Sequence, residues 1–425
     1  SFGDANGLRR TGWFSVWIVE IPVYQSTRMQ RKFDKPFTQQ EPIDEKTIER
    51  VGEILRTGRL HRYNTLSDEV SEAALLEREY ADWQGAKYCL ACASGGYALQ
   101  VAMRAAGLRP GDKVLANAYT LAPVPGAIHN AGGVPVFVEI DGDWHIDIAD
   151  LRSKAESSGA KFLMLSHMRG HIADMDAITE ICEEFEIALI EDCAHTMGAK
   201  WKGQRSGNFG RVAAFSAQTY KHINSGEGGL LTTDDPDIAA RAIVMSGSYM
   251  LYGSHGAAPD EEIFAQIKLE TPNYSGRMDN MRAALLRGQL SQLEENCRRW
   301  NARYQALELG LRKSNAIVVP RRAQHEAYVG SSIQFRPKLT GEAQFDRLIE
   351  NCAERGVDVK WFGAAQPKAF TSRFDSWAYL GDPPDLPATQ KVLAQTCDIR
   401  VPLTFSEEDC TLVAQIVAEE VEALA

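Results

Sequence analysis

The chain has 425 residues, of which 44% are apolar and 24% charged, so it can bury one large hydrophobic core or two ordinary ones. Its 46 Lys and Arg against 57 Asp and Glu leave a formal charge of −11, which argues against nucleic acid or an anionic membrane as a partner. Eight Cys are too few for a disulfide scaffold, and no window has the apolar length of a membrane helix, so a cytoplasmic location is expected.

Residues 1–44 are expected to form an N-terminal arm that packs on its own chain or on a neighbour. Arg9 and Arg10 precede an apolar stretch, Trp13–Tyr24, which contains Glu20 and Pro22. Because this stretch is short and no clear small-residue cleavage site follows it, a twin-arginine export signal is disfavoured.

From about residue 45 to residue 85 the apolar residues recur at helical spacing, and after that short apolar runs alternate with helical stretches. Strands joined by crossover helices in this order are typical of a parallel α/β sheet. The predicted strands are Lys87–Ser94, Lys113–Ala118, Pro135–Ile140, Lys161–His167, Ile187–Asp192 and Val212–Gln218, and the helices between them are Tyr97–Ala106, Pro123–Ala131, Ile148–Ala155 and Met175–Phe185.

A long helical stretch from about Arg277 to Lys313 is expected to connect two domains. Beyond it, Tyr328–Arg336 predicts a strand, and Ser406 with Asp409 forms a capping box that starts a last helix. The predicted architecture is a large domain over residues 45–285, with a mostly parallel sheet flanked by helices. A smaller α+β domain over residues 286–425 includes the connector, and a cleft separates the two.

Ligands of an open parallel sheet bind beyond the carboxyl ends of its strands, so the residues that follow each apolar run are informative. Ser94–Gly96 follows the first strand and opens a helix, whose free N–H groups suit a phosphate. Asp192 ends a later strand, and Lys221 lies five residues beyond Ser216 at the end of the next. A phosphate cradle, a carboxylate and a lysine are the groups that pyridoxal phosphate (PLP) requires, because the lysine forms a Schiff base and the carboxylate keeps the pyridine nitrogen protonated.

The stretch from Glu191 to Gly229 resembles the cofactor-binding core of the DegT/StrS-type aminotransferases, and it reads EDCAHTMGAKWKGQRSGNFGRVAAFSAQTYKHINSGEGG. These are fold-type I PLP enzymes that aminate keto sugars and cyclitols. Further segments resemble the family in the same order from about Glu45 to the C-terminus: GRLHRYN, LLEREYADWQGAKYCLACASGGYAL, SHMRGHIADMD and RMDNMRAALLRGQLSQLEENCRRWNARY. The resemblance implies PLP as the cofactor and transfer of an amino group from glutamate or glutamine to a keto sugar or ketocyclitol.

The resemblance also implies a role for each residue of the site. Lys221 would be the Schiff-base lysine and the proton carrier, and Asp192 would pair with the pyridinium nitrogen. The other implied cofactor contacts are Tyr119 and Ala194 on the two faces of the ring, His195 near the ring hydroxyl, and Gly95, Gly96, Ser216 and Gln218 around the phosphate. No metal is expected, and the family implies a homodimer whose subunits share the site.

Two positions depart from the family pattern around the phosphate. Gly96 stands where the family usually has Thr, which leaves more of the binding to backbone N–H groups. Ser275 stands where many members have an Asn that reaches the phosphate of a neighbouring subunit. The segment Asn273–Arg277 is nevertheless expected to cross the subunit boundary.

The segment Val359–Ala365 lacks the Pro-rich, His-ending sequence of many members that act on nucleotide sugars. Trp361 and Phe362 offer aromatic faces for a ligand, and Arg169 offers a forked cation for a carboxylate or phosphate if it points into the cleft. These features favour a small acceptor without a nucleotide. The alternative is that Trp361 and Phe362 fill the core between the domains.

The sequence also bears on two alternative functions and on two possible metal sites. A PLP-dependent dehydratase or eliminase is disfavoured, because relatives that remove oxygen replace the lysine at position 221 by histidine. A PLP-bound regulator without activity would not need the whole set of site residues. The spacings Cys89/Cys92 and His167/His171 could hold a metal, but no further ligands accompany them, so core thiols and cleft-lining histidines are expected.

Overall fold

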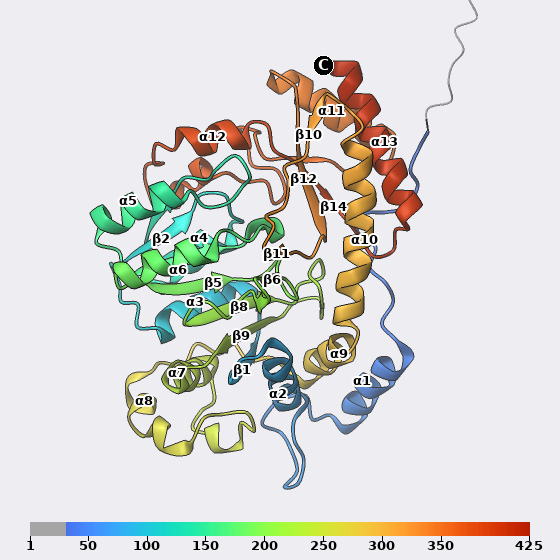
Figure 1. The fold of residues 1–425 in the computed structure, drawn as a ribbon. Coiled ribbons are helices and arrows are strands. Elements are labelled where there is room, and N and C mark those ends of the chain that lie inside the picture. The colour runs from blue at the N-terminus through green and yellow to red at the C-terminus, as the bar shows by residue number, and fades with distance from the viewer. Residues whose placement is uncertain (1–30) are drawn as a thin grey trace, which may run out of the picture. The chain divides into compact units, whose positions relative to one another are not determined.

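The computed structural model describes residues 31–425, so Arg9, Arg10, the stretch Trp13–Tyr24 and most of the predicted N-terminal arm lie outside the described residues. A seven-stranded sheet in the order β1-β9-β8-β5-β4-β2-β3 lies at the centre (Figure 1). Every strand points the same way except β9, which is antiparallel to β1 and β8. The strands are β1 (Tyr88–Cys92), β2 (Lys113–Asn117), β3 (Val134–Val138), β4 (Phe162–Ser166), β5 (Ala188–Asp192), β8 (Val212–Ser216) and β9 (Gly229–Thr233).

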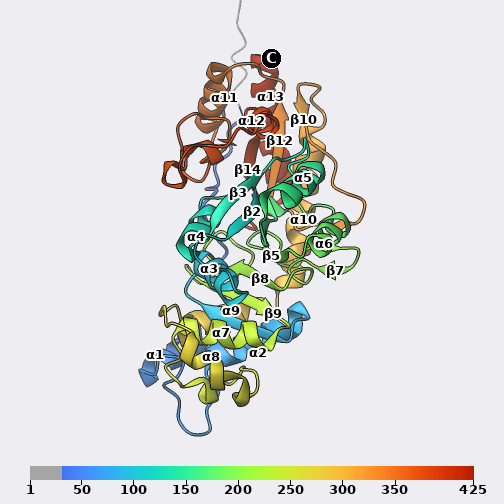
Figure 2. The same cartoon turned by 90° about the vertical axis from the view of Figure 1, so that its left-hand side faces the viewer.

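Helices cover both faces of this sheet, and Figure 2 shows α3 and α4 on one side with α5 and α6 on the other. Side chains alternate along each strand, so a separate apolar cluster lies on each face. Cys89 belongs to one cluster and Cys92 to the other, which confirms that they are core thiols on opposite faces. The helices are α2 (Glu72–Gln84), α3 (Gly95–Ala105), α4 (Pro123–Ala131), α5 (Ile148–Ser158), α6 (Met175–Glu184), α7 (Pro236–Ser246) and α8 (Phe264–Glu270).

A second, four-stranded sheet in the order β10-β12-β14-β13 is antiparallel throughout. Its strands are β10 (Ile317–Val318), β12 (Ser332–Pro337), β13 (Lys360–Trp361) and β14 (Cys397–Arg400). The predicted capping box of Ser406 and Asp409 is present and starts α13. The helices around this sheet are α11 (Glu342–Glu354), α12 (Pro387–Leu393) and α13 (Glu407–Leu424). A small three-stranded sheet joins β6 (Lys200–Trp201), β7 (Gln204–Arg205) and β11 (Glu326–Ala327).

The predicted connector is two helices rather than one: α9 (Asn280–Leu290), on which α1 (Glu45–Thr57) packs, and α10 (Leu293–Leu311). The helix breaks at Ser291, whose hydroxyl donates to the Gly288 carbonyl at 2.9 Å and so competes with the backbone ladder. Figure 1 shows α10 running from α9 to the second sheet. Residues 32–425 form one compact unit, and their division at residue 286 stays a prediction.

None of the helices in the described part of the chain combines the length and the apolar composition that crossing a lipid bilayer requires.

Candidate active site

A cavity of about 490 Å³ lies at the carboxyl ends of β1, β4, β5 and β8. Parallel strands bring residues far apart in the sequence to this edge, because each strand ends there. The cavity is lined by nine of the residues that the sequence analysis singled out: Ser94, Gly95, Gly96, Asp192, Ala194, His195, Ser216, Gln218 and Lys221.

Lys221 follows β8 and is half-buried, with its amine 2.8 Å from Nε2 of His195. Burial, reinforced by the positive charge of Arg169, lowers the pKa of Lys221 to about 7, although Asp192 opposes the shift. A large part of this amine is therefore neutral near pH 7, which is the form that attacks a carbonyl carbon.

His195 fixes the direction of that hydrogen bond. Its Nδ1 accepts the backbone N–H of Arg169 at 3.3 Å, so the proton of the neutral ring is on Nε2 and points at the amine of Lys221. Burial and the neighbouring Lys221 hold the pKa of His195 well below its ordinary value. The ring thus stays neutral and donates to the lysine nitrogen.

Asp192 ends β5 and is held by two donors. Its Oδ2 accepts the Ser166 hydroxyl at 2.9 Å, and its Oδ1 accepts the Ala194 N–H at 3.1 Å. The Ser166 hydroxyl in turn accepts that of Thr120 at 2.8 Å. Sequence analysis missed Ser166 and Thr120, although Ser166 is the last residue of β4 and so stands at the edge where ligands bind.

The start of α3 forms the third part of the site. Ser94 caps the helix by accepting the Tyr97 N–H at 3.1 Å, which leaves the N–H groups of Gly95 and Gly96 without an acceptor inside the helix. A Cβ at Gly95 would lie 2.8 Å from the Cβ of Ser216, so glycine lets this helix approach β8 closely. Free N–H groups at a helix N-terminus bind phosphate.

This donor set fits PLP. One cavity contains an amine on Lys221 with a lowered pKa, an oriented carboxylate on Asp192 and the N–H groups at the start of α3. Lys221 would hold the cofactor covalently, Asp192 would bind its ring nitrogen, and Gly95 and Gly96 would bind its phosphate.

Two predicted cofactor contacts lie outside the cavity lining. Tyr119 is buried, its ring meets Phe362 edge-on at 5.1 Å, and its hydroxyl has no hydrogen-bond partner within residues 31–425. Ser275 is exposed in the loop before α9, where its N–H and hydroxyl donate to Oδ1 of Asn273 at 2.9 and 3.2 Å. The roles of Tyr119 and Ser275 stay predictions.

The structure corrects the predicted acceptor contacts. Trp361 is buried, stacks on Phe345 at 4.6 Å and donates its indole N–H to the Ala394 carbonyl, and Phe362 is buried against Tyr119. Both aromatic side chains therefore fill the core.

Arg169 is buried and does not point into a cleft. It forms a two-pronged ion pair with Asp398 of β14 and lies over the ring of Phe370. The guanidinium is already neutralised by a protein carboxylate. Trp361, Phe362 and Arg169 therefore give no support to an acceptor without a nucleotide.

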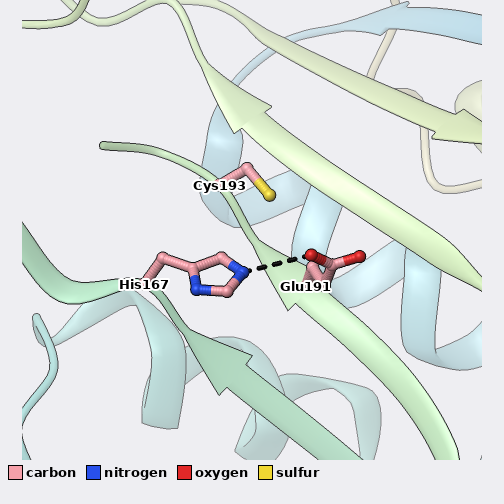
Figure 3. A group of neighbouring side chains, drawn as sticks. All are labelled: His167, Glu191 and Cys193. Carbon is pink, nitrogen blue, oxygen red and sulfur yellow. Dashed lines mark hydrogen bonds and ion pairs between the residues drawn. The ribbon is translucent and has the colours of Figure 1, made fainter. Parts of the chain in front are cut away.

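His167, Glu191 and Cys193 place possible ligand atoms within 4.8 Å of one another on the other side of β5 (Figure 3). The Glu191 carboxylate, however, already accepts four hydrogen bonds, one from Nε2 of His167 at 3.1 Å and three from the N–H groups of Gly207, Phe209 and Gly210. These side chains belong to the scaffold. His171 lies apart from them and is bonded to Gln334 at 2.6 Å.

The chain is similar in sequence to several known proteins. A GDP-perosamine synthase of Caulobacter vibrioides is 33% identical over 221 residues, which are 52% of this chain and 56% of that protein. An L-glutamine:2-deoxy-scyllo-inosose aminotransferase of Micromonospora echinospora is 30% identical over 268 residues, 62% of this chain and 63% of that protein. The matched regions thus span little more than half the length of these relatives.

The crystal structure of 3-amino-5-hydroxybenzoic acid synthase is similar to this one with a TM-score of 0.78 and 25% identity, over 92% of this chain and 100% of that chain. The mostly parallel sheet with flanking helices is the fold-type I architecture that the sequence predicted. A model of the DegT/DnrJ/EryC1/StrS aminotransferase family matches residues 41–418. The chain therefore belongs to the DegT/DnrJ/EryC1/StrS aminotransferase family.

Proposed function

We propose that the protein is a PLP-dependent aminotransferase that moves an amino group from glutamate or glutamine to a ketone on a sugar or cyclitol ring. The observation that carries this proposal is the meeting of Lys221, Asp192 and the start of α3 in one cavity. PLP, when bound, supplies an electron sink that stabilises negative charge on the substrate carbon.

Residues of the chain itself supply the proton transfer and the charge stabilisation that the reaction needs. Lys221 would hold the cofactor, and its amine would carry the proton that leaves the α-carbon of the donor, for which a pKa of about 7 suits it. Asp192 holds the proton on the ring nitrogen, and the Ser166 hydroxyl fixes the direction of that carboxylate. The same residues would serve when the amino group is delivered to the ketone.

The relatives support a ring ketone as the acceptor. Their names concern a perosamine, which is an amino sugar, and an inosose, which is a cyclitol ketone. The presence of Lys221 favours transamination over elimination, and a whole set of site residues favours an enzyme over a regulator.

A homodimer with a shared site is part of the same proposal. Tyr249 and Met250 are 60% and 58% exposed, and the guanidinium of Arg277 lies over the Tyr249 ring at 5.0 Å, beside Ser275. Large apolar side chains gathered at the surface are typical of protein–protein contacts. A cytoplasmic location is proposed because all eight Cys are free and buried.

The experiment is spectroscopic. Addition of L-glutamate or L-glutamine to the holoenzyme should remove the visible absorbance of the bound cofactor, and a ring ketone of the sugar or cyclitol class should restore it. Holoenzyme that stays coloured with both donors and with a panel of other amino acids would contradict the aminotransferase and support a regulator.

A further inference from the structure

A short turn after β4, Met168–Gly170, connects the cavity to the second sheet. Met168 lines the cavity, and the backbone N–H of Arg169 donates to Nδ1 of His195 at 3.3 Å. Nε2 of the same ring lies 2.8 Å from the amine of Lys221. The turn therefore reaches the reacting amine through one histidine ring.

Arg169 has a backbone conformation that its surroundings must hold in place. Its φ of 55° lies in the left-handed region, which residues other than glycine rarely adopt. Gly170 follows with a φ of 83°, and a Cβ there would lie 3.2 Å from the carbonyl oxygen of His195. The turn is thus packed against His195, and the contacts that hold Arg169 also hold its N–H on the ring.

The second sheet binds the turn at both of its ends. Asp398 of β14 is fully buried, and its Oδ1 accepts from Nε of Arg169 at 2.9 Å in the two-pronged ion pair. Gln334 lies opposite Asp398 on β12 and donates its NH₂ group to the same carboxylate at 2.6 Å. The carbonyl oxygen of Gln334 then faces Nε2 of His171, the residue after the turn, at 2.6 Å. Arg169 and His171 are therefore tied to two neighbouring side chains that are hydrogen-bonded to each other.

We propose that Asp398 and Arg169 are positioning residues: through their ion pair, the second sheet holds His195 against the amine of Lys221. This inference rests on the proposed function and adds to it two residues that do not line the cavity. An arginine–carboxylate pair with two parallel hydrogen bonds fixes direction as well as distance. Loss of Asp398 would free the guanidinium and remove a contact that keeps the turn in its left-handed conformation.

The same pair influences the charge around the reacting amine. The charged and titratable groups near Lys221 are His195, Asp192, Arg169, Arg400, His222 and Glu227. The positive charge of Arg169 lowers the pKa of Lys221, and Asp398 compensates part of that charge. Removal of Arg169 and removal of Asp398 should therefore move this pKa in opposite directions.

Two measurements on the full chain test the proposal. Competitive acetylation of the apoenzyme with acetic anhydride over a range of pH, followed by peptide mapping, gives the pKa of Lys221 without cofactor or turnover. The single-turnover reaction of the holoenzyme with L-glutamine gives the rate that depends on positioning. Thermal unfolding reports whether each variant is folded.

The variants are Arg169→Gln, Asp398→Asn and the double variant that carries both, with Arg355→Gln as the matched control. Arg355 is likewise buried and paired with a carboxylate, that of Glu420 at 2.7 Å, at the end of α11. It does not line the cavity. The double variant leaves neither member of the pair as a buried charge without its partner, which guards against loss of folding.

In Arg169→Gln the pKa of Lys221 should rise by about one unit, because a positive charge is lost and the Asp398 anion remains. In Asp398→Asn it should fall by about one unit, because the guanidinium loses its counter-charge. The double variant should lie between the two. All three variants should react with glutamine about 10- to 100-fold more slowly as the His195 contact loosens, and Arg355→Gln should match the wild type in both measurements.

A pKa of Lys221 that moves the same way in both single variants, or in neither, would overturn the proposal, because a merely structural defect produces no opposite shifts. A wild-type glutamine rate in Asp398→Asn would also overturn it. Should a single variant fail to fold, a folded double variant that reacts at the wild-type rate has the same meaning. If the wild-type holoenzyme reacts with no amino donor but the opposite shifts are found, the aminotransferase proposal fails while the positioning pair stands.

Discussion

Glu191 and Asp192 are neighbours on β5, yet they lie on opposite faces of the strand and have different surroundings. Asp192 lines the cavity and accepts one hydroxyl and one N–H group. Glu191 is fully buried away from the cavity and accepts four hydrogen bonds. A carboxylate that lines a cavity and can still accept hydrogen bonds is able to bind a ligand. A buried carboxylate whose oxygens already accept four hydrogen bonds stabilises the fold instead.

The backbone around Glu191 explains its role. The turn of residues 207–210 delivers three N–H groups to the carboxylate, and a Cβ at Gly210 would lie 2.5 Å from the Leu189 carbonyl, so the turn packs tightly on β5. Burial alone would raise the pKa of Glu191, but His167 and these N–H groups outweigh it and lower the pKa below the ordinary value.

The largest effect is expected on the cavity side, at Lys221. Lys221→Ala removes both the covalent anchor and the proton carrier, so the rate of amino transfer should fall by more than about 10³-fold. Borohydride reduction followed by peptide mapping checks the anchor in the wild type. The control is Lys202→Ala, because Lys202 is exposed and paired with Asp176. A reduced label on any lysine other than Lys221 would contradict the assignment.

A smaller loss is expected for Asp192→Asn. The amide no longer favours a protonated ring nitrogen, so the half-reaction with glutamine should slow by about 10²- to 10³-fold, as when one charge-stabilising contact is removed. Cofactor retention should also weaken, while the thermal midpoint of the apoenzyme should change little. A wild-type half-reaction rate in this variant would show that Asp192 does not tune the cofactor.

Glu191→Gln should give the opposite pattern. The side-chain NH₂ of glutamine is a donor, so at least one of the backbone N–H groups around it loses its hydrogen-bond acceptor. The free energy of unfolding should therefore fall by about 2–3 kcal/mol. Urea denaturation measures this loss, and the half-reaction rate per folded molecule should stay near that of the wild type. If catalysis were lost and stability kept, the contrast between the two faces of β5 would be wrong.

The pH dependence of stability sharpens this contrast. Because the folded-state pKa of Glu191 lies below the ordinary 4.5, its stabilisation is present above pH 4.5 and is lost as the pH falls through the folded-state value. Glu191→Gln removes this pH-dependent stabilisation. On acidification, the free energy of unfolding of the variant should therefore fall by less than that of the wild type.

Much of the fold was predictable because residues at the ends of many helices and strands are typical start and stop signals. The predicted helix Pro123–Ala131 is α4 to the residue, since Pro stands at its start and a glycine follows its end. The antiparallel strand β9 was not predicted, because it follows the glycine loop after Lys221 without a crossover helix that would mark it.

The sequence could predict only those site residues that follow directly from the end of one predicted strand. Asp192 and Lys221 follow apolar runs, so the sequence places them at one edge of the sheet. The contacts of Ser166 depend on the order β5-β4-β2 in space, which the order of strands along the chain does not give. Likewise, Arg169 and Asp398 are 229 positions apart, so no local pattern shows that one neutralises the other.

A moderate effect is expected from pH. The folded-state pKa of Lys221, about 7, lies below the ordinary 10.5, and the neutral amine is the reactive form. The rate of PLP incorporation into the apoenzyme should therefore rise by nearly 10-fold per pH unit below pH 7 and level off above it. Between about pH 7 and 10.5 the unfolded chain binds one more proton at this lysine, so apoenzyme stability should gain from it as the pH rises.

The smallest effect is expected at the thiols. Burial raises the pKa of Cys193 well above its ordinary value and the charge of Glu191 reinforces the shift, and burial raises that of Cys92 to about 12. Because the thiolate is the reactive form, an aromatic disulfide reagent should titrate none of the eight Cys in the native protein and all eight in denaturant. Glu191→Gln should speed labelling of Cys193, since that face opens more often when its hydrogen bonds are lost. If Cys193 reacts at once in the native wild type, this face of β5 is open to ligands after all.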